Sequence, residues 1–449
     1  MELGEVAPTS TEQIQRKTRG STGFLLVGVL LLAVVAVWWA IGLFQTVPQL
    51  SPGRADVDGK KFTTVPIMPF AGLDFHHNYV GVRSWKRGDD LYREMGGDPA
   101  NPKYTYPPTT LVAFSWTAWF PPSLHLNFNS ALGAFPFEPS FPAMFVWLTM
   151  IIVVVAAAAW RSWLFRTELG LPSLPLLFIL GATFASYPVI FEMERGNCNA
   201  LPLLAIFLLV PALRWQRQWL GDVFAGLCVA CAVGVKPFAI VLVLGLVAVR
   251  RARAAGLATV WLGVFCVVMW RDLVPWLEVA KVSTAIQQTG YLEFSHSLIS
   301  HWPLLMRDVG LPQLASWPPT VMVGGGMLIV ALVVSWRVFK SGEPRSIAWP
   351  YLLWLAAIAT FVSPVAQDYN LLFVPLVILG VWRADDSWWS HLCVCLALIW
   401  WQPFYFGLSG FPWHVLKAVS VVWVGWLVLA RLEPRGATSF VMPVGNVPT

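Results

Sequence analysis

Long runs of apolar residues constrain this chain more than any other feature of its sequence. A helix that crosses a bilayer needs about 20 predominantly apolar residues, and runs of this kind recur from residue 24 to residue 430. The runs are continuous rather than alternating, which excludes a closed transmembrane barrel. Charged residues make up only 12% of the 449 residues, about half their share in soluble domains. The chain is therefore predicted to be an all-α polytopic membrane protein.

The spacing of the runs predicts about twelve net crossings. Several runs contain only 13–15 residues, which is short for a simple crossing, and short helices that end at polar residues indicate a cavity in one half of the membrane. Residues 109–120 are expected to form a half-crossing or re-entrant helix. The full spans are expected at 24–44, 141–160, 172–190, 200–213, 221–235, 237–249, 257–270, 318–336, 347–362, 369–382, 390–406 and 412–430.

Lysine and arginine residues predict the orientation of these spans. Cytoplasmic loops carry an excess of both, and Arg16, Lys17 and Arg19 precede the first span. Alternating spans from a cytoplasmic N-terminus then bring every later basic cluster to the cytoplasmic side, so the net charge of +6 does not indicate nucleic-acid binding. We expect a cytoplasmic tail over 1–20, one transmembrane domain over 21–435 with its first extracytoplasmic loop at 45–108, and a tail over 436–449.

The polar interruptions on the opposite side are the most acidic in the chain. They are residues 45–108, "FEMERGNCN" at 191–199, Lys236, residues 271–319 and "SPVAQDYN" at 363–370. Ionisable groups at membrane depth are costly and usually functional. Acidic, basic and amide groups that face one compartment therefore predict a site there.

Asp74 is the first candidate residue. It opens the stretch "DFHHNYVGVRSW", in which Tyr79, Val82 and Trp85 have the spacing of a short amphipathic helix on the membrane surface. The carboxylate has two readings. It is either a helix N-cap satisfied by backbone amides, or a general base that removes a proton from a sugar hydroxyl.

The other candidates also have two readings each. Arg195 either neutralises a neighbouring glutamate or holds an anionic head group in bidentate geometry. Lys236 either extends to the membrane interface or contacts a phosphate. His296 is either a solvated loop residue or a hydrogen-bond donor to the substrate, and Asp368 either caps a helix or binds a sugar hydroxyl.

Together these groups suit glycosyl transfer from a lipid-linked phosphosugar. The departing phosphate needs fixed cations and the acceptor hydroxyl needs a base. No Gly-rich phosphate loop is present, and we expect neither a metal nor a cofactor. We predict donor-phosphate contacts from Arg195, Lys236 and His296, and sugar or acceptor contacts from His77, Tyr79, Glu194, Asn197, Asn199, Asp368 and Tyr369.

Several segments resemble, in order, the motifs of glycosyltransferase family 87. They are "GLDFHHNYVGVRSWKRGDDLY", the following "YPP", "RGNCNALPLL", "KPFAIVL", "FSHSLIS" and "SPVAQDYNLLFVPLVILG", and the resemblance extends over about residues 20–385. The known members of this family include a polyprenyl-phosphate-mannose-dependent mannosyltransferase. The resemblance implies the C-type glycosyltransferase architecture, with many membrane helices and an extracytoplasmic active site.

The resemblance also implies a mechanism. The catalytic carboxylate of the family lies in the first outer loop at the "DF" position, which is Asp74 here. The sugar would be transferred with inversion, and polyprenyl phosphate would leave. Mannosyl members have a histidine-rich segment where Asp368, Tyr369 and Asn370 stand in this chain, so the sugar stays open between a mannose-like hexose and a pentose.

We therefore expect a multi-pass protein of the cell membrane that binds a polyprenyl-phosphate sugar, membrane lipids and a lipid-linked or cell-envelope glycan acceptor, and no nucleic acid. A transporter or lipid flippase is the alternative from another class. It would show paired broken helices in the two halves and charges near the bilayer midplane, whereas the sequence has one large outer loop and one-sided polarity. A transferase of the same architecture for arabinose or an aminosugar, or a ligase, is a further alternative.

Overall fold

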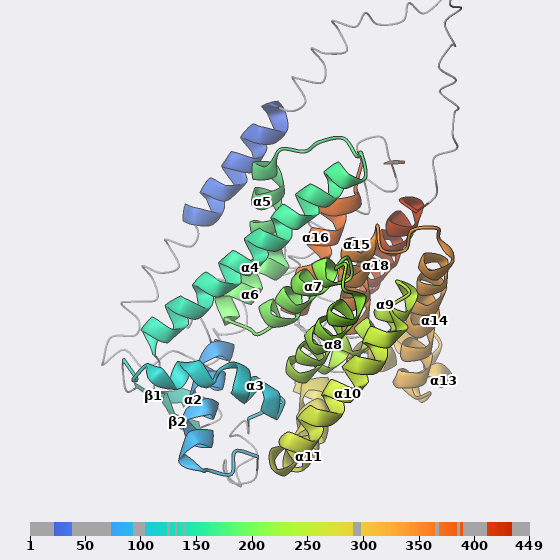
Figure 1. Ribbon diagram of the computed structural model, residues 1–449. Coiled ribbons are helices and arrows are strands. Elements are labelled where there is room, and N and C mark those ends of the chain that lie inside the picture. The colour runs from blue at the N-terminus through green and yellow to red at the C-terminus, as the bar shows by residue number, and fades with distance from the viewer. Residues whose placement is uncertain are drawn as a thin grey trace, which may run out of the picture.

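The polypeptide forms a bundle of helices that run between two ends of the molecule (Figure 1). The computed structural model describes residues 22–37, 73–92, 104–123, 126–130, 133–137, 140–290, 298–363, 368–383, 387–388 and 411–432. Within these ranges helices dominate, and the described strands pair as one antiparallel hairpin, β1 (Leu126–Ser130) with β2 (Gly133–Phe137). Apart from this hairpin, the predicted all-α class is confirmed.

The described helices follow the predicted spans closely. The first is Thr22–Val37. The others are α2 (Leu73–Arg87), α3 (Pro108–Ala113), η2 (Ser115–Trp119), α4 (Phe141–Glu168), α5 (Leu176–Phe184), α6 (Tyr187–Arg195), α7 (Ala200–Ala212), α8 (Gln218–Val235), η3 (Pro237–Ile240), α9 (Val241–Ala248), α10 (Ala252–Val268), α11 (Trp270–Gly290), α12 (Leu298–Asp308), α13 (Pro312–Ala315), α14 (Pro319–Lys340), α15 (Ala348–Thr360), η5 (Asp368–Leu372), α16 (Phe373–Val381) and α18 (Phe411–Ala430).

Membrane-spanning length is reached in two ways. Among the described residues, α4, α8 and α14 are each long and apolar enough to cross alone. Two further pairs of helices reach this length only when each pair is taken together. The helices α5 and α6 are bent by 64° at a short break, and α10 and α11 by 96°. Six other apolar helices have 10–17 residues. These helices are compatible with a membrane protein. The count of twelve and the C-type architecture stay predictions, and the span expected at 390–406 lies outside the described residues.

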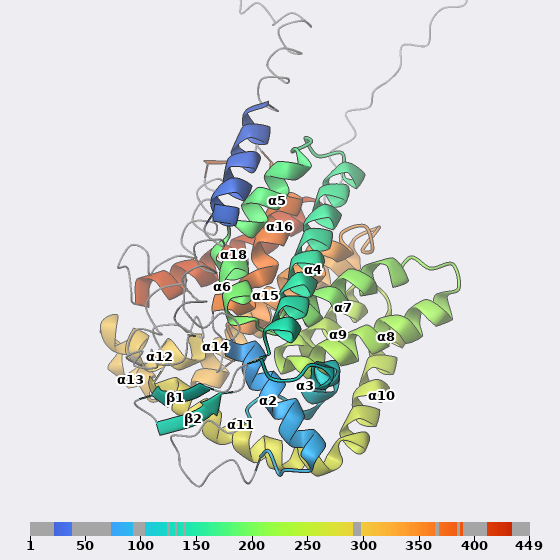
Figure 2. The same cartoon turned by 90° about the vertical axis from the view of Figure 1, so that its left-hand side faces the viewer.

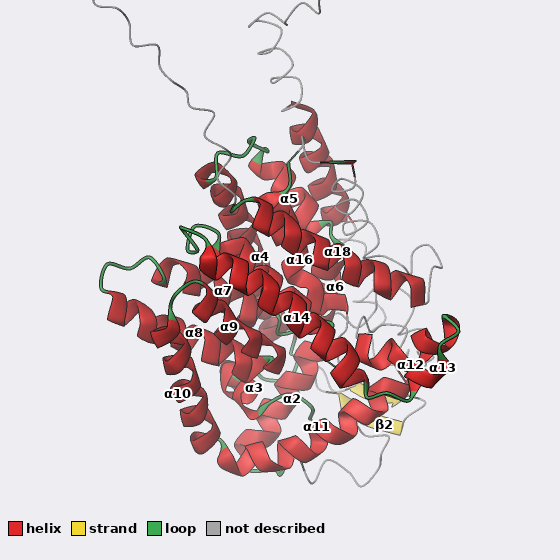
Figure 3. Cartoon of the chain, turned by 90° about the vertical axis from the view of Figure 1, so that its right-hand side faces the viewer, coloured by secondary structure: helices red, strands yellow, loops and turns green. Residues whose placement is uncertain are grey.

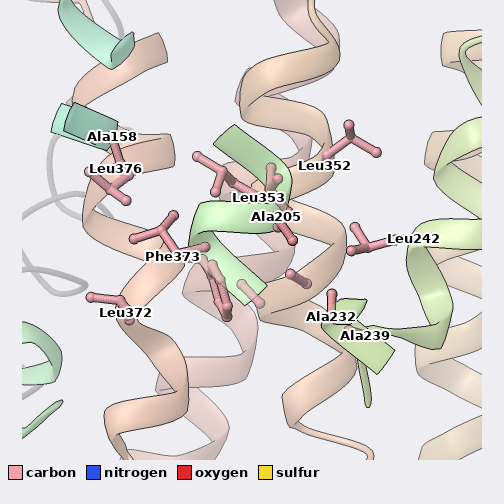
Figure 4. Close-up of a cluster of buried hydrophobic side chains, with 14 of the residues drawn as sticks. Ala158, Ala205, Ala232, Ala239, Leu242, Leu352, Leu353, Leu372, Phe373 and Leu376 are labelled. Atoms are coloured by element: carbon pink, nitrogen blue, oxygen red, sulfur yellow. The ribbon is translucent and has the colours of Figure 1, made fainter. Parts of the chain in front are cut away.

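The centre of the bundle is α15. Every residue of this helix except Ala359 is buried, as expected for a helix that is apolar on all sides. Leu352 and Leu353 of α15 lie among Ala205, Leu242 and Phe373 from three other helices (Figure 4). Small residues at such crossings let helix backbones approach closely, which is the main source of packing energy where lipid replaces water.

One end of the bundle is tied together by arginines. The buried Arg166 of α4 donates to the carbonyl oxygens of Trp382 (2.6 Å) and Pro172 (2.7 Å). Arg251, at the start of α10, pairs with Asp222 of α8 at 3.0 Å. We call this the arginine end. Each of its arginines forms a hydrogen bond to a neighbouring segment or, for Arg161, to Glu168 at the end of the same helix. The arginines are Arg161, Arg166, Arg214, Arg250, Arg251 and Arg431.

The opposite end carries most of the irregular structure. Here α2, α3, the hairpin and α11 gather beyond the ends of the long helices (Figure 2). The 96° bend after α10 turns α11 across this end (Figure 3), where Trp276 of α11 donates to the carbonyl oxygen of Thr105 at 3.0 Å. The helix predicted after Asp74 is present as α2, but its residues from Asp74 to Trp85 are buried or half-buried, so it packs into this end of the molecule instead of lying on a surface.

Candidate active site

Asp74 lies in the first turn of α2 and contacts another part of the chain. Its Oδ2 accepts a hydrogen bond from Asn197 Nδ2 at 2.6 Å, and its Oδ1 lies 3.3 Å from Arg195 Nη2. Only 13% of the Asp74 side chain and 21% of the Arg195 side chain are exposed. The carboxylate thus bonds side chains 121 and 123 residues away in sequence, rather than acting solely as a helix cap.

The turn between α6 and α7 supplies both partners. Residues 191–199 were predicted as a polar interruption outside the spans, but α6 extends to Arg195, so Arg195 lies on a helix. The helix ends at Gly196, whose φ of 60° is the left-handed conformation that glycine adopts without strain. This geometry turns the chain sharply, so that Arg195 and Asn197 both face Asp74.

Buried hydrogen bonds hold this turn in one conformation. Trp147 of α4 donates to the Gly196 carbonyl oxygen at 2.9 Å. Glu192, which is fully buried, accepts from Asn199 Nδ2 at 2.9 Å and from the backbone N–H of Ala200 at 3.1 Å. Because buried polar groups are costly unless they are bonded, these contacts specify the turn, and through it the positions of Arg195 and Asn197.

Lys236 approaches the same cluster from α8. It follows the last residue of that helix in an extended conformation, and Pro237 begins the next turn. Its Nζ lies over the ring of Tyr106, 5.2 Å from the ring centroid, in cation–π geometry. The Tyr106 hydroxyl in turn accepts from Asn197 Nδ2 at 3.1 Å. The structure therefore brings Asp74, Arg195, Asn197 and Lys236 together; with Tyr106 we call them the Asp74 cluster.

Histidines line the adjacent face of α2. The ring of His77 stacks on Tyr104, with 5.2 Å between centroids, and is tilted against Tyr106 at 6.0 Å. Burial lowers the pKa of His77 from its ordinary value, and the nearby Asp74 charge opposes this only in part. Burial also lowers the pKa of His76 to about 3. Both imidazoles are therefore neutral at neutral pH.

The thiol beside the cluster is not a nucleophile. Cys198 is buried between Asn197 and Asn199, and burial raises its pKa to about 12. A thiol attacks as the thiolate, which this environment suppresses. In the part of the chain that the structure describes, no three His, Cys, Asp or Glu side chains gather at metal-ligand spacing.

Tyr79 does not lie in the Asp74 cluster, which corrects its assignment to sugar or acceptor binding. It is fully buried on the other side of α2, between Phe75 and the η2 region. Its hydroxyl donates to the carbonyl oxygen of Phe120 at 2.9 Å. Tyr79 therefore fixes α2 against η2, and we do not include it in the site.

The side chains of four predicted site residues are not described by the structure. Glu194 lies on α6 and Asp368 and Tyr369 lie on η5, which packs against α6, but their side chains are outside the described part of the structure. His296 lies outside the described residues altogether. Their predicted contacts stay predictions.

Two residues of the site were not predicted. Neither Tyr106 nor Glu192 was among the predicted site residues. A usable signal for Tyr106 was its place before Pro107, because a residue before proline is held in extended conformation and Tyr104 and Tyr106 then lie on one side. Glu192 carried no such signal, because its partners depend on the fold of the turn.

Comparison with known proteins identifies the family of this chain. No curated protein matches the chain. The profile of glycosyltransferase family 87 matches residues 104–364, which is narrower than the resemblance over residues 20–385, so Asp74 and Asp368 lie outside the match. The matched part contains Tyr106, Arg195, Asn197 and Lys236. Because the match covers more than half of the chain, this protein belongs to glycosyltransferase family 87 and is a membrane glycosyltransferase.

Proposed function

We propose that this protein is an inverting glycosyltransferase that moves a sugar from a polyprenyl-phosphate donor to a lipid-linked or cell-envelope glycan on the extracytoplasmic face of the cell membrane. The sugar is a mannose-like hexose or a pentose. The observation that carries the proposal is the contact of a mostly buried carboxylate, Asp74, with the guanidinium of Arg195 at 3.3 Å, with the Lys236 ammonium held one aromatic ring away.

The proposed chemistry is a single displacement. Asp74 accepts the proton of the acceptor hydroxyl while the hydroxyl oxygen forms a bond to the anomeric carbon of the donor. The bond between that carbon and the phosphate oxygen breaks on the opposite face, and the phosphate leaves with the electron pair. Arg195 and Lys236 stabilise the charge that develops on the phosphate. Attack and departure on opposite faces invert the anomeric carbon.

Charge balance supports a monophosphate-linked donor. Of the two cations in the Asp74 cluster, Arg195 contacts the Asp74 carboxylate. A sugar linked through one phosphate carries one negative charge in the ground state and gains a second as its leaving group departs. Two cations beside one carboxylate match that change, whereas a diphosphate-linked donor would bring more negative charge than the cluster offsets.

Two buried polar atoms support sugar binding beside this cluster. His77 Nε2 and Asn199 Oδ1 have no hydrogen-bond partner among the described residues. Most buried polar atoms in proteins are bonded, and sugar hydroxyls can both donate and accept. We therefore keep His77 and Asn199 as proposed sugar or acceptor contacts.

The test compares two aspartate substitutions on the same stretch of chain. Asp74→Asn keeps the side-chain volume and removes the base, so we expect transfer to fall at least a hundredfold. Asp89→Asn is the matched control, because Asp89 is 44% exposed and pairs only with Arg87 among the contacts described for it. Purified protein in proteoliposomes is given a panel of polyprenyl-phosphate sugars, and release of polyprenyl phosphate is measured.

The outcomes separate the parts of the proposal. Loss of release in Asp74→Asn, with Asp89→Asn unchanged and both variants equally stable, supports the assignment of the base. Full activity of Asp74→Asn removes Asp74 from the mechanism. If no polyprenyl-phosphate sugar in the panel is consumed by the unaltered protein, the donor class is wrong.

A further inference from the structure

Tyr106 connects the two functional halves of the Asp74 cluster. Its hydroxyl accepts from Asn197 Nδ2 at 3.1 Å, and the same amide nitrogen donates to Asp74 at 2.6 Å. Its ring lies under the Lys236 ammonium at 5.2 Å. One side chain therefore touches a partner of the carboxylate through its hydroxyl and the amine through its π face.

The orientation of the Asn197 amide makes the hydroxyl contact specific. Asn197 Oδ1 accepts from the backbone N–H of Cys198 at 2.7 Å, which fixes the oxygen on that side and directs Nδ2 to Asp74. A planar amide has two hydrogens on this nitrogen. With one directed at Asp74, the other is directed at Tyr106. Loss of the Tyr106 hydroxyl would leave this amide hydrogen without the acceptor it has here.

The backbone beneath Tyr106 is fixed from two directions. Tyr92 donates to the Tyr106 carbonyl oxygen at 3.0 Å, and Trp276 of α11 donates to the Thr105 carbonyl oxygen at 3.0 Å. Pro107 restricts Tyr106 to extended conformations. The backbone that carries the Tyr106 ring is thus constrained. A residue that positions its neighbours needs such a fixed backbone.

We propose that Tyr106 is a positioning residue that sets the base and a phosphate-binding cation in one geometry. The hydroxyl orients Asn197 against Asp74, and the ring holds the Lys236 ammonium where the donor phosphate binds. This inference rests on the proposed function and deepens it, because it assigns the two roles to different atoms of one side chain. The two roles can therefore be separated by substitution.

Tyr106→Phe removes the hydroxyl and keeps the ring. We expect kcat to fall about tenfold, the cost of one lost hydrogen bond in the transition state, while the donor KM stays within twofold. Tyr351→Phe is the matched control, since it removes a buried hydroxyl bonded to Ser335 at 2.6 Å, remote from the cluster; its kinetics should not change.

Tyr106→Leu removes the ring as well. We expect the same fall in kcat and, in addition, a donor KM raised about tenfold, because the cation–π contact no longer holds Lys236. In a Lys236→Met background, the change from Tyr106→Phe to Tyr106→Leu should leave the donor KM unaltered, since the ring acts through that amine. This double-mutant cycle measures the coupling directly.

A binding measurement keeps the test independent of turnover. Polyprenyl monophosphate alone, added to the detergent-solubilised protein, should raise its unfolding temperature; Tyr106→Phe should keep this shift and Tyr106→Leu should reduce it. The inference is overturned if Tyr106→Phe has wild-type kcat, or if the effect of the ring on the donor KM persists without Lys236. If the Tyr106 variants behave normally while Asp74→Asn is inactive, only the inference fails. If the unaltered protein neither transfers sugar nor is stabilised by polyprenyl monophosphate, the proposed function fails and this inference fails with it.

Discussion

At the scale of single residues, the candidate site depends on polar groups that are bonded to each other inside an apolar bundle. Glu192 illustrates this, because its two carboxylate oxygens accept from Asn199 and from the N-terminal backbone of α7. An acceptor at a helix N-terminus also interacts favourably with the helix dipole. Glu192 thus fixes the start of α7 without contacting Asp74 in any described hydrogen bond, and it places the residues that do.

The buried histidines of α2 make stability depend on pH. Burial lowers the pKa of His76 from 6.5 to about 3, so between these values the unfolded chain binds a proton that the folded chain does not. The free energy of unfolding is therefore highest above pH 6.5. It falls by about 1.4 kcal/mol per pH unit as the pH decreases toward 3, because protons bind the unfolded chain preferentially. We expect the unfolding temperature in detergent to fall steadily from pH 6.5 to pH 4. His76→Phe should flatten this slope, and an unchanged slope in that variant would exclude His76 as its source.

Residue-level prediction succeeded where a charge interrupts an apolar run. Arg195 and Lys236 were selected for that reason, and Asp74 because it opens a short helix in the first outer loop. The three residues lie together, and their roles stay predictions. The prediction failed for Tyr79, because helical spacing alone does not say which face of α2 packs against the bundle. The hydroxyl of a tyrosine also satisfies a buried backbone carbonyl as readily as it binds a sugar.

At the scale of elements, the first helix is held by a glycine crossing. Residues 22–37 pack on α5, where a Cβ on Gly28 would lie 2.5 Å from the backbone nitrogen of Phe178 and one on Gly181 would lie 2.5 Å from the carbonyl oxygen of Gly28. Close backbone approach between small residues is a common basis of helix association in membranes. Phe24 and Phe178 continue this interface with an edge-to-face contact at 4.9 Å.

This crossing predicts opposite effects for one substitution at two sites of the same helix. Gly28→Ala forces the helices apart and should destabilise the protein by about 1–3 kcal/mol. Gly23→Ala meets nothing within 4 Å and should be neutral or slightly stabilising, because alanine favours the helix more than glycine does. Thermal unfolding of both purified variants provides the comparison. A Gly28→Ala protein as stable as Gly23→Ala would contradict the crossing.

The sequence predicts the helices better than their bends. Apolar runs mark where a helix is buried or faces lipid, so α7, α8, α9, α14, α15 and α16 begin and end within about four residues of the predicted spans. The 64° break between α5 and α6 was not predicted, because the apolar run continues through it. A bend is decided by packing against neighbours, which a one-dimensional pattern does not contain. The hairpin was missed because its strands are short and follow proline-rich chain.

At the scale of the whole molecule, the Asp74 cluster and the arginine end lie at opposite ends of the same helices. Helix α7 runs from Ala200, beside the cluster, to Ala212, next to the Leu213 carbonyl oxygen that Arg251 binds. Helix α8 returns from Asp222 to Lys236. This separation agrees with the positive-inside rule if the arginine end is cytoplasmic.

Sidedness can be measured in intact cells with two variants that each add one cysteine to the chain. Asp89→Cys, near the cluster end, should react with a membrane-impermeant maleimide from outside. Arg217→Cys, at the exposed start of α8, should react only after the cells are permeabilised. The unaltered chain, whose own cysteines control for background, should stay unlabelled. The reverse pattern would place the Asp74 cluster in the cytoplasm and overturn the proposed location.

The shortness of α7 has a consequence for how the reactants travel. Thirteen residues rise only about 20 Å, less than the roughly 30 Å hydrocarbon layer of a bilayer. If the arginine end lies at one membrane surface, Asp74, which contacts Asn197 just before the other end of α7, is expected to lie below the opposite surface instead of in bulk water. Under the proposed function, a lipid-borne phosphosugar would then reach the site by lateral diffusion within one leaflet, with its tail staying in the hydrocarbon layer. The acceptor sugar would have to enter below the membrane surface to be modified.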